Sequence, residues 1–176
     1  MHNKSLLGSA MKKQGFTLIE LMVVIVIISI LSAVAVPKLF GMIAKSKASE
    51  LSAAAKTYIK LQDSYASEHH QLGSWSLIGY VAPGSKVSTD SSKTNNFGYG
   101  GGMLKGNGSE GSAAINTVER AIVGWIATSL VALNDVPVNS SWTITISTSG
   151  SGDLSYSTTI PVNAGSLTPG FTRLGR

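Results

Sequence analysis

The sequence of 176 residues contains no cysteine. Disulfides, thiolate metal sites and cysteine nucleophiles are therefore excluded. A folded domain without these cross-links is held together by its apolar core, and a chain of roughly 100–150 residues is long enough to form one.

Charged side chains are also scarce. They make up 13% of the residues, which is about half the share in a typical soluble domain. Of the 14 lysines and arginines, Lys4, Lys12 and Lys13 precede Phe16, so 11 basic residues face 9 acidic ones in the rest of the chain. The formal net charge of +5 therefore belongs largely to the N-terminus, and we expect no nucleic-acid interface of basic and aromatic residues.

Motifs for catalysis are missing as well. The glycine-rich segments 97–102 and 106–108 lack the Gly-Lys-Ser/Thr ending of a phosphate-binding loop, and their pattern predicts turns between short strands. His69 and His70 are adjacent and do not converge on one ion, and the serines are not set in a Gly-x-Ser-x-Gly turn. We expect no enzymatic activity, no metal site and no cofactor.

One run is strongly hydrophobic. Residues 16–36 read FTLIELMVVIVIISILSAVAV, with Glu20 as the single charge. As an α-helix this run spans roughly 30 Å, the thickness of the hydrocarbon core of a bilayer. Lys12 and Lys13 precede it, so the positive-inside rule places the N-terminus in the cytoplasm and the rest of the chain outside.

Three interpretations of this run compete. A signal peptide cleaved after Ala33-Val34-Ala35 is the first, but the apolar run is long and an amphipathic pattern continues beyond it. A simple transmembrane anchor is the second, but it leaves Glu20 unexplained, since a carboxylate costs roughly 2.5–3.5 kcal/mol at mid-bilayer and less near the ends. A charge retained at this place indicates a binding partner.

The third interpretation rests on residues 12–21, KKQGFTLIEL. This stretch closely resembles the processing signature of type IV pilins and the related pseudopilins, and the resemblance extends to about Leu61. In that family a membrane peptidase cleaves between the residues matching Gly15 and Phe16 and then methylates the new amine of Phe16. The resemblance implies that Glu20 pairs with the Phe16 amine of a neighbouring subunit in a filament.

The same resemblance implies a structural function. The chain would lie in the inner membrane before assembly and then in an extracellular pilus, as a homo-oligomeric helical filament that serves adhesion or motility. Its partners would be the prepilin peptidase and methyltransferase and an assembly platform in the inner membrane. A type II secretion pseudopilin is the alternative, although the acidic calcium loop and the tyrosine-proline motif of major pseudopilins are not evident. Asp135 and Asp153 alone fall far short of a six-oxygen calcium site.

We expect four segments: a leader over residues 1–15, a hydrophobic transmembrane helix over 16–36, an amphipathic helix over 37–68 and a β-rich head over 69–176. Either Met1 or Met11 can be the start, since Met11 leaves the short basic leader MKKQG. Pro37 removes a helical hydrogen bond. The resemblance implies that the helix melts there during assembly, and a simple kink is the alternative.

The fold class that follows is α+β, a pilin fold in which one long N-terminal helix, from about Phe16 to Glu68, packs on an antiparallel sheet. The helix stripe predicted to face the sheet steps by three or four residues and comprises Ala44, Ala48, Leu51, Ala55, Tyr58, Gln62 and Tyr65, widened by Ile59 and Leu61.

In the head, the sequence predicts some strands more clearly than others. Segment 121–133 favours a buried strand through about Thr128, and segments 141–147 and 154–160 alternate, which predicts a hairpin around a turn at 149–153 that ends at Pro161. Segment 73–80 predicts a short strand or an ordered loop. A further alternative is a minor pilin that binds carbohydrate or a surface through exposed aromatic rings, for which the candidates are Trp75, Tyr80, Phe97 and Tyr99; the same rings suit a small core equally well.

Overall fold

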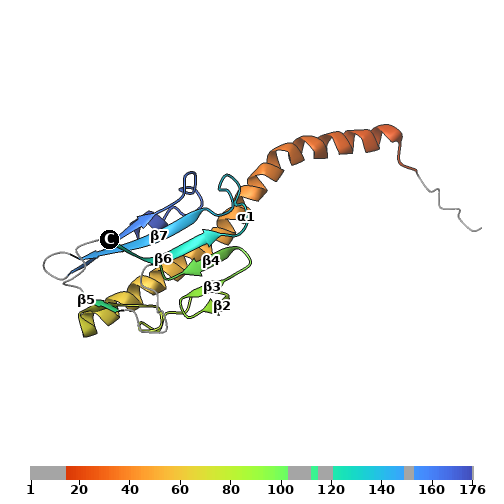
Figure 1. The fold of residues 1–176 in the computed structure, drawn as a ribbon. Helices are drawn as coiled ribbons and strands as arrows, with labels where there is room; N and C mark the ends of the chain where they lie inside the picture. The colour runs from red at the N-terminus through yellow and green to blue at the C-terminus, as the bar shows by residue number, and fades with distance from the viewer. Residues whose placement is uncertain (1–14, 103–111, 115–120, 149–152, 176) are drawn as a thin grey trace, which may run out of the picture. The chain divides into compact units, whose positions relative to one another are not determined.

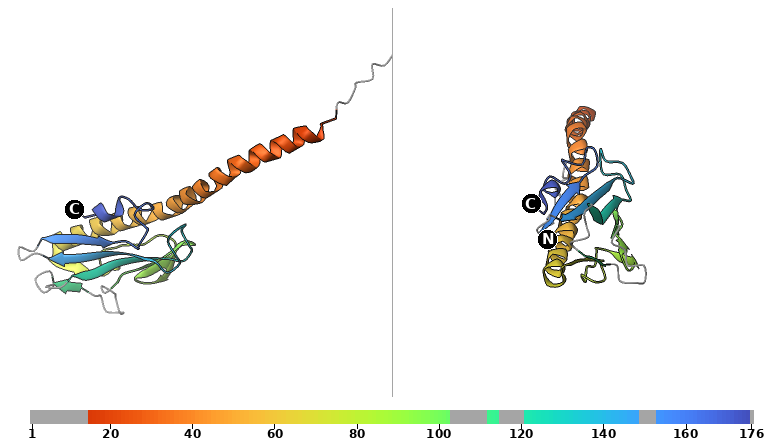
Figure 2. Two further views of the ribbon diagram at one scale, coloured as in Figure 1. Left: turned by 90° about the horizontal axis from the view of Figure 1, so that it is seen from above. Right: turned by 60° about the vertical axis from the view of Figure 1, so that its left-hand side comes forward.

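The computed structural model describes residues 15–102, 112–114, 121–148 and 153–175. The chain divides into two compact units, Met1–Leu39 and Phe40–Arg176. One α-helix, α1 (Leu18–His69), contains the boundary between them (Figures 1 and 2). The predicted helix is thereby confirmed with nearly the same bounds. The predicted leader, apart from Gly15, lies outside the described residues.

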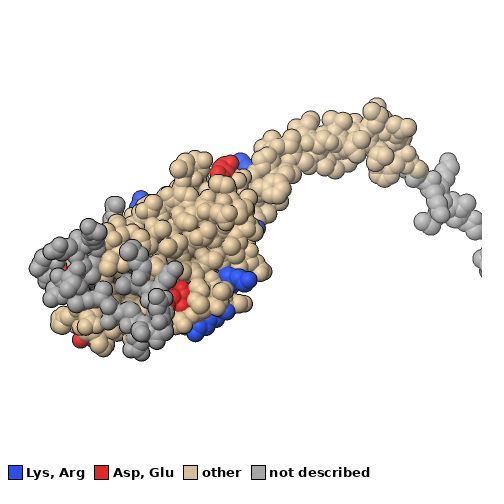
Figure 3. Space-filling model, in the orientation of Figure 1, with Lys and Arg blue, Asp and Glu red and all other residues tan. Residues whose placement is uncertain are grey.

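The first unit consists, in its described part, of an apolar helix without a packing partner. Every residue from Gly15 to Phe40 is exposed, and the face of the apolar run visible in Figure 3 carries no charge. The hydroxyl of Ser29 donates a hydrogen bond to the backbone oxygen of Ile25 at 2.7 Å, so this polar group is satisfied inside the helix. Pro37 lies within α1, which is helical on both sides of it.

The second unit contains the predicted antiparallel sheet. Six strands are hydrogen-bonded in the order β2-β3-β4-β6-β7-β8, all antiparallel, and β1 pairs with β5 in a separate two-stranded sheet. The strands are β1 (Gln71–Gly73), β2 (Ser85–Ser88), β3 (Ser91–Lys93), β4 (Phe97–Gly100), β5 (Ser112–Ala114), β6 (Ile122–Ser129), β7 (Ser141–Thr148) and β8 (Leu154–Thr159).

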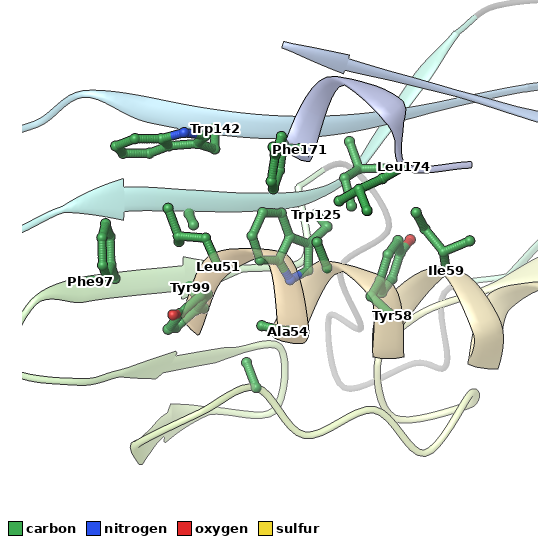
Figure 4. Packing of buried hydrophobic residues seen from close by; sticks show 14 of the residues in the cluster. Leu51, Ala54, Tyr58, Ile59, Phe97, Tyr99, Trp125, Trp142, Phe171 and Leu174 are labelled. Atoms are coloured by element: carbon green, nitrogen blue, oxygen red, sulfur yellow. The ribbon is translucent and has the colours of Figure 1, made fainter. Parts of the chain in front are cut away.

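The core of the head lies between α1 and one face of the six-stranded sheet (Figure 4). The predicted helix stripe is confirmed, because six of its seven members are buried and Tyr65 is half-buried. The structure adds Ala54 and Ala66 to the buried face. Small residues alternate with Leu51, Tyr58 and Ile59 along the stripe, so α1 approaches the sheet closely between its larger side chains.

Strands β6, β7 and β8 follow the sequence pattern. Trp142, Ile144 and Ile146 on β7 alternate on one face and are fully buried, as predicted. The hairpin of β7 and β8 is confirmed by its register, in which Ile144 pairs with Thr158, and Pro161 follows its end. The predicted turn lies at residues 149–153, most of which are outside the described part of the chain.

Two predictions for the first half of the head are corrected. Segment 97–100 is the strand β4 and not a turn, with Phe97 and Tyr99 buried on one face and the glycines on the other. Segment 73–80 is an ordered turn beyond Gly73, so its strand alternative is wrong there. The other predicted glycine turn, 106–108, lies outside the described residues.

Polar tethers join α1 to the sheet. The hydroxyl of Tyr99 on β4 donates to Glu50 Oε1 at 3.0 Å, and that of Tyr156 on β8 donates to Asp63 Oδ1 at 2.5 Å. The hydroxyl of Tyr80 donates to the backbone oxygen of Ala54 at 3.1 Å. Each tether fixes the helix at a different point along its length, which sets its position more specifically than apolar contact alone.

The C-terminal segment is held without a disulfide. Phe171, in the short 3₁₀ helix Phe171–Arg173, is fully buried and lies 6.0 Å from the ring centre of Trp125. The indole nitrogen of Trp142 donates to Thr168 Oγ1 at 3.1 Å, and Leu174 is buried nearby in the same core. An aromatic plug and one buried hydrogen bond therefore attach this segment to the sheet.

Gly124 marks the closest approach of β6 to α1. It lies at a bulge between Val123 and Trp125, and a Cβ atom there would come within 2.1 Å of the Tyr58 hydroxyl and 3.0 Å of Ile146 Cδ1. The Tyr58 hydroxyl is buried and has no hydrogen-bond partner among the described residues. Only a residue without a side chain leaves room for this packing of Tyr58 against the strand.

We expect Gly124→Ala to lower the free energy of unfolding by about 1–3 kcal/mol, because overpacking forces side chains or backbone to shift. Urea denaturation followed by tryptophan fluorescence measures this. Gly100→Ala on β4, where a Cβ meets nothing within 4 Å, is the matched control and should change stability by about 0.5 kcal/mol or less. Adding Tyr58→Phe to Gly124→Ala should restore part of the loss; equal stability of the two alanine variants would contradict the packing argument.

The buried tyrosines also predict a loss of stability in alkali. Burial raises the pKa of Tyr58, Tyr80, Tyr99 and Tyr156, that of Tyr80 to about 12, and neighbouring carboxylates raise those of Tyr99 and Tyr156 further. The folded chain thus keeps phenol protons that the unfolded chain loses near pH 10. This stability is complete below about pH 10 and is lost above it, by about 1.4 kcal/mol per pH unit for each tyrosine still protonated when folded.

Urea midpoints between pH 8 and pH 11.5 measure this dependence. Tyr156→Phe should remove one tyrosine's share of the slope above pH 10 while leaving the remaining slope in place. A midpoint that does not change up to pH 11 would contradict the prediction.

Candidate functional site

The predicted cleavage position lies at the start of the described chain. Gly15, Phe16 and Thr17 precede the helix and are not helical. A Cβ placed on Gly15 would meet nothing within 4 Å, and the side chain of Phe16 is 87% exposed. The peptide bond between Gly15 and Phe16 is therefore in an irregular, accessible segment, as a peptidase requires.

The first turn of α1 is a capping box. Glu20 Oε2 accepts a hydrogen bond from the backbone nitrogen of Thr17 at 2.7 Å and from its hydroxyl at 2.6 Å. Thr17 Oγ1 in turn accepts from the Glu20 nitrogen at 3.3 Å. These reciprocal bonds satisfy backbone donors that a helix start otherwise leaves unpaired.

Among the described residues, no cation pairs with the charge of Glu20. Its hydrogen-bond donors there are the backbone nitrogen and the hydroxyl of Thr17, and both are neutral. The carboxylate can accept up to about four hydrogen bonds, so one oxygen is open to a further donor. An ammonium group from another chain would meet this need.

The comparisons with known proteins address this same segment. The family described as "Prokaryotic N-terminal methylation motif" matches residues 10–36, a range that includes Gly15, Phe16 and Glu20. The N-terminal segment therefore carries this methylation motif. The chain is also 46% identical over 57 residues to the type IV major pilin protein PilA of Myxococcus xanthus (strain DK1622). That match covers 32% of this chain and 26% of the relative, so it leaves about two thirds of this chain without a counterpart.

The predicted fold agrees with this class. A long N-terminal helix packed on an antiparallel sheet is the architecture that the resemblance implied.

The polar residues considered for metal binding are dispersed. His69 ends α1 and stacks on Tyr65, with ring centres 4.3 Å apart, while His70 follows with a positive φ of 53°. Asp135 accepts from the neighbouring amide of Asn134 at 2.8 Å. Among the described residues, no group of three or more histidine or carboxylate side chains is placed to hold a metal ion.

The aromatic rings considered for ligand stacking belong to the core. Trp75, Tyr80, Phe97 and Tyr99 have exposed fractions of 2%, 3%, 0% and 3%. Tyr80 accepts a hydrogen bond from the indole of Trp125 at 3.0 Å. The interpretation of these rings as an exposed binding surface is therefore wrong, because at most 3% of each residue's surface is exposed.

A cavity of about 180 Å³ opens beside two of these rings. It lies between the turn that carries Trp75 and Tyr80 and the hairpin of β2 and β3, where Lys86 and serine hydroxyls line it. Neither a carboxylate nor a histidine is among its lining residues. The cavity therefore lacks the histidine and carboxylate side chains that most often act as general acids and bases.

Sequence reasoning found Glu20 but missed the role of Thr17. The pattern Thr17-x-x-Glu20 before an apolar run is itself a helix-start signal. Both residues were interpreted only as part of the processing signature. The tyrosine-carboxylate tethers were also missed. The two residues of each tether lie 49 and 93 residues apart in the sequence, respectively. A local sequence pattern therefore cannot predict these hydrogen bonds.

Proposed function

We propose that this chain is the precursor of a type IV pilus subunit. A peptidase removes the leader at Gly15, the new amine on Phe16 is methylated, and the apolar helix holds the subunit in the inner membrane until it joins an extracellular filament. The observation that carries this is the prepilin motif at an accessible helix start that is followed by a wholly exposed apolar helix. One helix in the described chain is long and apolar enough to cross a membrane.

The exposed helix supports assembly through its own surface. From Leu18 to Val36 its only polar side chains are Glu20, Ser29 and Ser32, so water is an unfavourable solvent for it. A lipid bilayer and a bundle of identical helices both give this helix apolar surroundings. Its transfer from lipid into the bundle changes the buried apolar area little. The shape of the helix surfaces and the Glu20 carboxylate therefore determine how the subunits are arranged.

Glu20 supplies that order. The desolvated Glu20 carboxylate and a desolvated Phe16 ammonium of a neighbour each compensate the other, and a misplaced partner leaves both uncompensated. The ammonium exists only after cleavage, so only processed subunits can form the pair. A contact between Phe16 of one copy and Glu20 of the next is heterologous and does not close, which produces a filament.

Adhesion or motility is the task we assign to the filament, and a type II secretion pseudopilin is the runner-up. The similarity to a protein named as a type IV major pilin supports the pilus. A minor pilin that binds ligands has lost its main support with the burial of Trp75, Tyr80, Phe97 and Tyr99.

Mass spectrometry of the N-terminus, on protein recovered from sheared cell surfaces, tests processing. We expect a chain that begins at N-methylated Phe16, because Phe16 is exposed and residues 12–21 resemble the prepilin processing signature within the matched methylation motif. A chain that begins at Val36, after the Ala33-Val34-Ala35 site, would identify an ordinary secreted protein and would exclude the filament.

Substitution of Glu20 tests assembly. We expect Glu20→Gln to be processed normally but to reduce the yield of sheared filaments by about tenfold or more, because the neutral amide cannot compensate an ammonium. Thr17→Val is the matched control, since it removes the hydroxyl of the capping box and keeps the carboxylate. Equal filament loss in both variants would show that Glu20 acts only as a cap, and wild-type yield from Glu20→Gln would reject the pair altogether.

A further inference from the structure

The cavity beside Trp75 and Tyr80 has the size of a single ring. It lies between segment 75–82 and the hairpin of β2 and β3, and β2 is one edge of the six-stranded sheet (Figure 1). Its volume is about 180 Å³, whereas an engineered cavity of about 150 Å³ in another protein holds a benzene molecule. The space therefore admits one six-membered ring that carries a substituent.

The deeper part of the cavity is apolar. Trp75, Tyr80 and Ala82 line it, and at most 3% of each is exposed. The indole nitrogen of Trp75 donates to the backbone oxygen of Gly124 at 3.3 Å, and the hydroxyl of Tyr80 donates to that of Ala54 at 3.1 Å. Both rings thus use their polar atoms inside the core, so they contribute mainly carbon to the cavity.

The rim of the cavity is polar and basic. Lys86 is exposed and is the one charged side chain among the described residues that line the cavity. The hydroxyls of Ser88 and Ser91 lie 2.6 Å apart. One of them donates to the other, so the second O–H can donate to a ligand. Thr89 adds a further exposed hydroxyl.

Hydrogen bonds hold the two walls in place without a ligand. The hydroxyl of Ser92 on β3 donates to the backbone oxygen of Pro83 at 2.9 Å, which connects the hairpin to the end of the facing segment. Within that segment the Tyr80 nitrogen donates to the Trp75 oxygen at 2.8 Å. A preformed cavity binds more tightly than one that must be ordered by its ligand.

Asp90 does not alter the sign of this rim. It belongs to the turn between β2 and β3 but is only 6% exposed and is not among the residues that line the cavity. Its backbone oxygen accepts a hydrogen bond from the Gly101 nitrogen at 2.9 Å. The charge that the rim presents to a ligand is therefore that of Lys86.

These features together select one class of ligand. A neutral ring leaves Lys86 unused, and a bare phosphate leaves the apolar part of the cavity unfilled. An aromatic carboxylate takes serine and threonine hydroxyls out of water without returning a hydrogen bond, which is unfavourable. A ring that carries hydroxyls, C–H groups and a carboxylate fits all three parts of the cavity.

We propose that this cavity binds one hexuronic acid residue, such as the terminal residue of an acidic polysaccharide. Lys86 binds the carboxylate, the hydroxyls of Ser88, Thr89 and Ser91 bind those of the sugar, and its C–H groups face the apolar part. The inference rests on the proposed function, which places the head outside the cell. One such site is weak, but a filament repeats it many times, and multivalent binding strengthens attachment without new contacts.

Fluorine NMR of the full-length chain in nonionic detergent tests the site. The three tryptophans, Trp75, Trp125 and Trp142, are labelled with fluorine, and replacing one at a time by phenylalanine assigns their signals. Trp75 lines the cavity, whereas Trp125 and Trp142 are fully buried in the core. Sodium glucuronate is the probe, and glucose, benzoate and inorganic phosphate are the comparison ligands.

We expect glucuronate to shift the Trp75 signal to saturation and to leave the Trp142 signal in place. Lys86→Gln should weaken glucuronate binding by about three- to fivefold, because an exposed ion pair is lost. It should not change the weaker binding of glucose, which has no carboxylate. Lys93→Gln is the matched control, since Lys93 is exposed on β3 but does not line the cavity.

Three results would overturn the inference. Shifts that are absent, or equal for all three tryptophans, would exclude binding in the cavity. Equal affinity of Lys86→Gln and the unsubstituted chain for glucuronate would exclude the contact between lysine and carboxylate. Benzoate or phosphate bound as tightly as glucuronate would exclude recognition of the sugar hydroxyls.

The outcome is separable from that of the proposed function, because the measurement uses single subunits. A chain that begins at N-methylated Phe16 but does not bind glucuronate would retain the pilus and lose only this site. A chain that binds glucuronate but begins at Val36 would retain the site and lose the pilus.

Discussion

The packing of the α1 stripe on one face of the six-stranded sheet is the interaction on which the head depends. The stripe combines small residues with Leu51, Tyr58 and Ile59, and the facing strands contribute tryptophans and isoleucines of β6 and β7. Two further features of the head depend on this contact. The bulge at Gly124 gives Tyr58 its space, and the C-terminal plug at Phe171 closes the core against Trp125.

A chain without cysteine must define this contact by other means. Apolar packing tolerates small shifts along a helix, whereas hydrogen bonds from Tyr99 to Glu50 and from Tyr156 to Asp63 do not. These bonds place a charged acceptor at the rim of the core, where water still reaches one side of it. The result is a helix whose register is set from two different strands.

Much of the fold could be predicted because its larger elements repeat a simple pattern. The 3.6-residue period identified α1, and the alternation of Trp142, Ile144 and Ile146 identified β7. The short strands β1, β2, β3 and β5 could not be found, since three or four mostly polar residues show no period. Segment 97–100 was wrongly predicted to form a turn, because its glycines are typical of turns. In β4 these glycines lie on the face away from the buried Phe97 and Tyr99. The methylation motif could be recognised because it is local. The Thr17 cap is also local but was overlooked. The burial of Trp75 and Tyr80 depends on contacts with β6 and α1 that are distant in sequence.

The order of the sheet leaves β2 and β8 as its two edges. A filament would concentrate a great many such edges within a few nanometres of one another, which is the condition under which strands add to foreign sheets and grow cross-β aggregates. The β2 edge is four residues long, carries Lys86 and is irregular in register against β3, and β8 runs into Pro161. These features disfavour strand addition. In the proposed filament, crowded heads can then remain separate folded bodies and need not add strands to one another's sheets.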